Sequence, residues 1–349
     1  MSALPRLSYP VDAPPALGAT VEIAPGVLWL RMPLPFALDH INLWLLPEAA
    51  GSATLVDCGY GDLSTRTLWE RHIATTLASM PIRRIVATHY HPDHIGNASW
   101  LSARFGAPVA MTHAEYLTAH ASACQFGGYT AEATISLFRS HGMSGTDLAA
   151  LEKRGNNYRR GVPDLPQSFD RMLDGEIRLA GDSSWRVISG YGHSPEHASL
   201  YCAERGVLIS GDMLLPRIST NVSVTAVDPD GDPLRRFLDS LSAFTDLPPE
   251  TLVLPSHGLP FRGIAVRIAQ LKAHHEARLA ELDDAVRKAA APLCAADLVP
   301  LLFRRELDIQ QRYFAMGEAI AHLNFLWRSA KLERRVDADG SIRFAPAVG

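Results

Sequence analysis

The stretch Thr88-His89-Tyr90-His91-Pro92-Asp93-His94 places three imidazoles and one carboxylate within six residues. It directly follows Arg84-Ile85-Val86-Ala87, an apolar run typical of a buried strand. Imidazole nitrogen and carboxylate oxygen are ligands that suit zinc, and sites that mix them are typically catalytic rather than structural. A chance run in a surface loop is the alternative, but only 14 of the 349 residues are histidine, which argues against accident. The stretch therefore predicts a metal site at the end of a strand.

Four further motifs lie around this stretch. Val56-Asp57-Cys58-Gly59 precedes it, and the three that follow are Gly192-His193-Ser194-Pro195-Glu196-His197, Ser210-Gly211-Asp212 and Pro255-Ser256-His257-Gly258. Together with H-x-H-x-D-H, they resemble in order the motifs of the metallo-β-lactamase superfamily. The five matches span Asp57 to His257, the whole expected catalytic domain. One residue departs from the family pattern, since Glu196 stands where the family usually has glycine.

The resemblance implies two adjacent metal sites that share one carboxylate. The implied ligands of the first ion are His89, His91 and His193. The implied ligands of the second ion are Asp93, His94 and His257. Asp212 is implied to bind both ions. Asp57 is implied to orient the ligand loop without touching metal, and His197 to be structural rather than a ligand. Zinc is the favoured metal, with iron and manganese as alternatives.

This ligand set implies hydrolysis by a metal-activated water. Two ions about 3.5–4 Å apart can share a water and lower its pKa toward about 7, which supplies hydroxide at neutral pH. The hydroxide would attack a carbonyl carbon or phosphorus while a metal stabilises the developing oxyanion. Asp93 and Asp212 are the candidates to accept or pass the proton. No nucleophilic serine or cysteine is needed.

The order of the expected elements favours the α/β class. Strand-like runs alternate with helical ones from Val21 to Leu254, including an expected strand at Asn221–Val227. The resemblance implies a four-layered αβ/βα sandwich of the metallo-β-lactamase type. We expect this catalytic domain to cover residues 1–263. The remaining residues, 264–349, contain three helical patterns and two short strands around Asp339-Gly340, the outline of a winged-helix-like domain.

A helix-prone segment at about 114–169 interrupts the catalytic domain. A segment this long between strands is often a lid, so we expect it to select the substrate and to contribute no metal ligand. Tyr158, Arg159 and Arg160 in this insertion form a candidate clamp for a carboxylate or phosphate. A solvated polar patch is the alternative interpretation of the same three residues.

Composition indicates an ordinary soluble protein. The net charge is −4, so no overall basic field points to nucleic acid or an anionic membrane surface as a partner. No window approaches the roughly 20 apolar residues that span a bilayer, and we see no signal-peptide pattern. The four cysteines are far apart and indicate a reducing compartment, so the cytoplasm is the expected location. The expected partner is a small-molecule substrate, and a homodimer is left open.

The leading functional hypothesis is hydrolysis of an ester-like bond. An acyl thioester, of the glyoxalase II-like or acyl-CoA type, is the first choice, because the chain resembles the glyoxalase II-like branch that carries a winged helix. A lactone or another ester is the nearest alternative. A metal-dependent nuclease or phosphodiesterase is a second hypothesis, and a non-catalytic metal-binding regulator is a third. The complete ligand set argues against the regulator.

Overall fold

The computed structural model describes residues 6–347, which form two compact units. The first unit contains the described residues up to Ala123, together with Tyr158–Thr220 and Ser240–Ile268. The second unit contains Cys124–Asn157, Asn221–Asp239 and the described residues from Ala269 onward. Each unit is therefore built from several separate stretches of the chain.

The strands are β1 (Val21–Ala24), β2 (Val27–Pro33), β3 (His40–Glu48), β4 (Ser52–Val56), β5 (Ile82–Val86), β6 (Val109–Thr112), β7 (Asp170–Met172), β8 (Ile177–Ala180), β9 (Ser183–Gly190), β10 (His197–Cys202), β11 (Val207–Gly211), β12 (Leu252–Pro255), β13 (Leu332–Val336) and β14 (Ile342–Pro346). The helices are α1 (Leu63–Ala74), α2 (Pro92–Ile95), α3 (Ala98–Phe105), α4 (His113–Cys124), η1 (Gly127–Tyr129), α5 (Ala131–Ser140), α6 (Gly145–Arg154), α7 (Tyr158–Gly161), α8 (Pro233–Ser240), η2 (Leu241–Phe244), α9 (Ile264–Lys288), α10 (Ala295–Leu302) and α11 (Ile309–Arg328).

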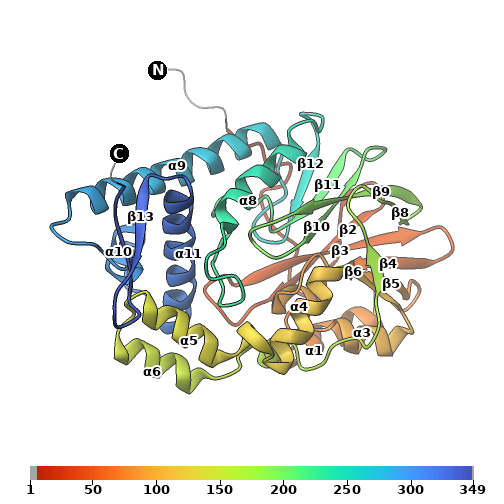
Figure 1. Cartoon of the computed structure of the whole chain (residues 1–349). Coiled ribbons are helices and arrows are strands. Elements are labelled where there is room, and N and C mark those ends of the chain that lie inside the picture. The colour runs from red at the N-terminus through yellow and green to blue at the C-terminus, as the bar shows by residue number, and fades with distance from the viewer. Residues whose placement is uncertain (1–5, 348–349) are drawn as a thin grey trace. The chain divides into compact units, whose positions relative to one another are not determined.

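Two mixed sheets form the first unit (Figure 1). Within residues 6–347, one sheet has seven strands in the order β1 to β7, and the other has five in the order β12-β11-β10-β9-β8. A buried apolar cluster joins side chains of both sheets, such as Trp29 and Trp44 from the first and Trp185 and Leu200 from the second. The expected α/β sandwich is confirmed.

Alternation along β3 explains how the first sheet packs on both faces. Ile41, Leu43 and Leu45 belong to the cluster that also contains Trp69 of α1, Leu101 of α3 and Ala119 of α4. Trp44 and Leu46 belong to the cluster between the sheets. Because both faces of β3 are buried, its sequence is a nearly continuous apolar run, as expected for an inner strand of a layered α/β fold.

Parallel pairing gathers the motifs at common sheet edges. β4 pairs parallel with β5, so the chain leaves both strands at the same edge, through Asp57 and the loop that begins at Thr88. β11 pairs parallel with β12, which likewise brings Asp212 and His257 to one edge. Sheet topology thereby places Asp57 near Thr88 and Asp212 near His257, although each pair is separated by more than 30 positions in sequence.

The three expected helices and the expected hairpin are present, and all of them except the first residues of α9 belong to the second unit. α9, α10 and α11 are followed by β13 and β14, which pair antiparallel around Asp339-Gly340, where Gly340 has φ 82°. The structure thus contains these elements, while the winged-helix interpretation stays a prediction. The expected strand at Asn221–Val227 is wrong, because Val224 N donates to the carbonyl of Gly317 in α11 instead of to a neighbouring strand.

The division into units differs from the expected linear boundary at 263/264. The insertion is helical as expected, but only Cys124–Asn157 of it belongs to the second unit, and its two ends belong to the first. The physical reason is packing between distant segments, as when Ala296 N donates to the carbonyl of His141. Among the described residues, no helix has both the length and the apolar character to cross a membrane.

Candidate metal centre

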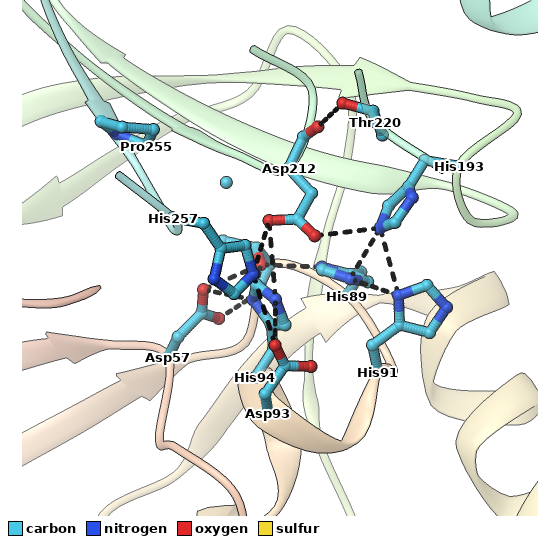
Figure 2. Close-up of polar contacts among 12 residues, drawn as sticks. Asp57, His89, His91, Asp93, His94, His193, Asp212, Thr220, Pro255 and His257 are labelled. Carbon is cyan, nitrogen blue, oxygen red and sulfur yellow. Dashed lines mark hydrogen bonds and ion pairs between the residues drawn. The ribbon is translucent and has the colours of Figure 1, made fainter. Parts of the chain in front are cut away.

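Three imidazoles converge at the first predicted site (Figure 2). His89 Nε2 lies 2.8 Å from His91 Nδ1 and 3.2 Å from His193 Nε2, and the last two atoms lie 3.1 Å apart. His89 and His91 come from the loop after β5, whereas His193 comes from the loop between β9 and β10. The structure therefore brings together nitrogen atoms that are over one hundred residues apart in sequence.

The second predicted site combines two imidazoles with carboxylates. Asp93 Oδ2 lies 3.6 Å from His94 Nε2 and 3.4 Å from His257 Nε2. Asp93 and His94 belong to the short helix α2, and His257 follows β12. All seven predicted ligands are thus accounted for, in groups that could hold metal ions.

Asp212 lies between the two groups, with one oxygen toward each (Figure 2). Its Oδ2 is 3.3 Å from His193 Nε2. Its Oδ1 is 3.5 Å from His257 Nε2 and 3.7 Å from His94 Nε2. A single carboxylate with this orientation can bridge two ions, which is the role that the sequence resemblance implies for it.

The donor geometry fits zinc-sized ions. With zinc–nitrogen bonds of about 2.0–2.1 Å, neighbouring ligand atoms of a tetrahedron are about 3.3 Å apart. The separations at both sites are close to this value, at 2.8–3.2 Å and 3.4–3.7 Å. In addition, His94 Nε2 and Asp212 Oδ1 are buried and accept or donate no hydrogen bond among the described residues. Buried polar atoms without partners are costly, and a bound cation would satisfy them.

The electrostatics of the two groups also favour cations. Burial, reinforced by the neighbouring His193, lowers the pKa of His91 to about 3, so this ring is a neutral donor. Burial raises the pKa of Asp93, but His94 and His257 outweigh it and bring this pKa to about 2. For His94, burial is outweighed by Asp57, Asp93 and Asp212, which raise its pKa to about 10. A metal ion bound at His94 Nε2 would replace the proton on that nitrogen and would interact favourably with the same carboxylates.

Asp57 holds the loop that begins at Thr88 in place through hydrogen bonds. Its Oδ1 accepts from Thr88 N at 2.8 Å, and its Oδ2 accepts from Thr88 Oγ1 at 3.0 Å. His94 Nδ1 lies 2.8 Å from the same Oδ2, which leaves His94 Nε2 to face the metal site. Asp57 adopts a positive φ of 61°, uncommon for a residue with a side chain, so local strain accompanies this arrangement.

We expect Asp57→Ala to weaken metal binding and lower turnover by about 10–100-fold, since it removes a partner that orients a ligand and not a ligand itself. Equilibrium titration with zinc and steady-state kinetics measure both effects. Asp62→Ala is the matched control, because the Asp62 carboxylate accepts from Thr65 N and so caps α1, whereas Asp57 accepts from Thr88. A loss of the same size in the control would contradict the role of Asp57.

His197 lies behind the metal ligands as a hydrogen-bond acceptor. Its Nε2 accepts from Asp212 N at 3.1 Å, and the ring is fully buried. A side chain at Gly211 would collide with this ring, and Gly211 has φ 52°, so glycine is required there. His197 therefore supports the backbone of the bridging aspartate, in agreement with the structural role implied by the resemblance.

Glu196 caps a helix instead of reaching the metal. Its carboxylate accepts from Ala114 N, at the start of α4, at 3.3 Å, and its carbonyl accepts from Thr112 Oγ1 at 2.7 Å. A carboxylate near a helix N-terminus is favourable because backbone N–H groups there lack partners within the helix. The departure from glycine thus has a local structural reason.

Sequence reasoning missed Glu115 and the role of His40. Glu115 is fully buried and accepts hydrogen bonds from two ligand loops, as detailed below. His40 binds the loop after β12 twice, since its carbonyl accepts from His257 Nδ1 at 2.7 Å and its Nε2 accepts from Gly258 N at 2.8 Å. Neither residue lies in one of the five motifs. The burial of Glu115 would have indicated a special role, but the sequence does not reveal burial at that position.

The three residues of the candidate substrate clamp differ in their contacts. Tyr158 Oη donates to Tyr90 O at 2.7 Å, which fixes α7 against the ligand loop. Arg159 Nε and Nη1 donate to the carbonyls of Ala123 and Pro163, each at 3.1 Å, so this guanidinium is used within the fold. Arg160 is exposed. The clamp formed by Tyr158, Arg159 and Arg160 stays a prediction, and because Arg159 already has two hydrogen bonds within the fold, Arg160 is the residue on which we base its test.

Comparison with known proteins supports the motif assignments. The profile of the Metallo-beta-lactamase superfamily matches residues 38–257, and that of the Metallo-beta-lactamase-like, C-terminal domain matches residues 279–347. A crystal structure of a Beta-lactamase domain protein from Burkholderia ambifaria is 48% identical, with a TM-score of 0.90 over 98% of each chain. A metallo-beta-lactamase family protein from Thermus thermophilus is 30% identical, with a TM-score of 0.77 over 93% of this chain and all of its own. A Bacillus subtilis protein named a probable metallo-hydrolase is 24% identical over 86% of this chain and 92% of its own.

Proposed function

The chain belongs to the metallo-β-lactamase superfamily. We therefore propose that it uses two metal ions to hydrolyse an ester-like bond. Zinc is the metal that we favour. An acyl thioester is the substrate class that we favour. One observation carries the proposal: the seven ligand-type side chains lie in overlapping groups that could hold metal ions, and Asp212 places Oδ2 near His193 and Oδ1 near His257.

The chain's own residues would divide the work as follows. Bound metal ions supply Lewis acidity and a water of lowered pKa. Asp212 holds the two sites at a fixed separation through its two oxygens. Asp93 is the second candidate to receive a proton, because its side chain is 17% exposed and so can meet both water and substrate. His89 is kept neutral by burial and by the neighbouring histidines, which lower its pKa well below the usual range.

The choice of an acyl thioester rests on the resemblance to the glyoxalase II-like branch. Lactones and other esters are the nearest alternatives, because the same attack on a carbonyl carbon would cleave them. The test is a panel of thioesters, lactones, β-lactams and phosphodiesters with the zinc-loaded protein. The proposal predicts the highest kcat/KM for a thioester, and Asp212→Ala protein serves as the inactive control. Turnover of phosphodiesters alone would contradict the proposal.

A nuclease function has less support in the second unit. Several of its basic side chains are paired with acids, including Arg334 with Asp230 at 2.9 Å and Arg343 with Asp337 at 2.7 Å. Neutralisation of phosphates by free basic residues supplies most of the affinity for nucleic acid. The complete ligand set likewise gives no support to a regulator without catalysis.

We expect Arg160→Ala to raise KM for an anionic thioester about tenfold, or about 1.4 kcal/mol, with little change in kcat. The reason is that Arg160 is exposed and follows Tyr158, which contacts the ligand loop at Tyr90. Arg159→Ala should instead lower the unfolding temperature, because it removes two hydrogen bonds to carbonyl groups. Kinetics with an anionic and a neutral thioester separate the two effects, and an equal rise in KM for both substrates would argue against the anion clamp.

A further inference from the structure

Glu115 is a fully buried carboxylate outside all five motifs. It is the third residue of α4, at the start of the helical insertion. A buried carboxylate is costly unless hydrogen bonds compensate for its lost hydration. Three donors provide this compensation, and they belong to the two loops that supply the ligands of the first metal site.

Each oxygen of Glu115 serves a different ligand loop. Oε2 accepts from Tyr90 N at 2.9 Å, and Tyr90 lies between the ligands His89 and His91. Oε1 accepts from Ser194 Oγ and from Glu196 N, both at 2.6 Å, and Ser194 directly follows the ligand His193. One side chain therefore connects the backbone on both sides of a three-histidine site.

The connection with the second loop is reciprocal. Glu196 N donates to the carboxylate of Glu115 in α4, while the carboxylate of Glu196 accepts from Ala114 N in the same helix turn. Thr112 Oγ1 also donates to the carbonyl of Glu196. These bonds resemble a helix capping box in which one half is supplied by a distant loop.

We propose that Glu115 is a positioning residue for the first metal site, the one formed by His89, His91 and His193. Glu115 sets the separation between the loop of His89 and His91 and the loop of His193. The second site does not depend on it, because His94 is oriented by Asp57 and His257 is oriented by His40. The inference rests on the proposed metal centre and extends it to a residue of the insertion.

The test measures zinc affinity by equilibrium titration in backgrounds that retain one site. His257→Ala disables the second site, and His91→Ala disables the first. In the His257→Ala background, Glu115→Ala should weaken the remaining site about 10–100-fold, the usual effect of losing a residue that orients a ligand. In the His91→Ala background, the same substitution should change zinc affinity less than twofold. General destabilisation of the fold would instead weaken both backgrounds.

Conservative variants keep the test informative if Glu115→Ala does not fold. Glu115→Gln retains the shape, but its amide N–H₂ must face either Tyr90 N–H or the donors Ser194 and Glu196, so an intermediate loss at the first site is expected. Ser194→Ala removes one donor of the three and should give a smaller loss. Glu196→Ala is the control, because it removes the cap on Ala114 N and leaves the contacts of Glu115 in place.

The outcomes separate this inference from the proposed function. Selective loss of zinc at the first site supports the role of Glu115. Equal losses at both sites, or unchanged affinity in Glu115→Ala and Glu115→Gln, overturn it while the metal centre stands. Absence of zinc binding in the unsubstituted protein would overturn the proposed metal centre and the role of Glu115 together.

Discussion

Asp212→Ala is expected to lower kcat/KM by about three orders of magnitude or more, or about 4 kcal/mol of transition-state stabilisation. The reason is geometric. Asp212 contributes Oδ2 to the group around His193 and Oδ1 to the group around His94 and His257, so its loss removes a ligand from both sites at once. Figure 2 shows the Asp212 carboxylate between the two groups.

Metal content distinguishes this effect from a defect in folding. Elemental analysis of Asp212→Ala should show reduced occupancy of both sites, whereas His91→Ala and His257→Ala should each reduce only one. Asp212→Asn keeps the size of the side chain and removes its charge, so its intermediate occupancy would attribute the loss to the carboxylate. If Asp212→Ala and Asp57→Ala caused equally mild losses, the bridging role would be wrong.

Removal of metal is expected to abolish activity and to lower the unfolding temperature. The unsubstituted protein should contain close to two ions per chain, because His89, His91 and His193 form one donor group and Asp93, His94 and His257 form another. An ion at about 1,000 times its Kd stabilises the native state by about 4 kcal/mol, which corresponds to roughly 5–10 °C for a protein of this size. The side chains that would lose their partner include His94, whose Nε2 is buried without a hydrogen bond.

Treatment with EDTA, followed by elemental analysis, thermal unfolding and kinetics, measures these effects. Zinc should restore activity and the unfolding temperature, and parallel additions of iron and manganese rank the alternative metals. Asp212→Ala is the control, since its unfolding temperature should respond little to EDTA. Fewer than one ion per chain, with none regained on addition of zinc or manganese, would contradict the metal centre.

The sequence alone identified the seven candidate ligands and the class of the fold. His89, His91, Asp93 and His94 lie within one short stretch, so their common role was visible from spacing. The remaining ligands lie in short motifs of recognisable order, because each motif is a tight loop at a strand end whose local geometry depends on neighbouring residues. The same locality explains why the sequence predicts helices within residues 264–349, of which α9 (Ile264–Lys288) is the first.

The tertiary structure alone decided which distant residues support these ligands. In sequence, Glu115 reads as an acid in the first turn of a helix, where many acids occur because of the helix dipole. Its burial and its bonds to Tyr90 and Ser194 arise only when α4 packs against two loops, one of them about 80 residues further along the chain. The assignment of Cys124–Asn157 to the second unit and the loss of the expected strand at Asn221–Val227 have the same origin. Such contacts join residues that are far apart in sequence, and no periodic pattern of residues connects the two positions. The local sequence therefore cannot specify these contacts, which arise only from tertiary packing.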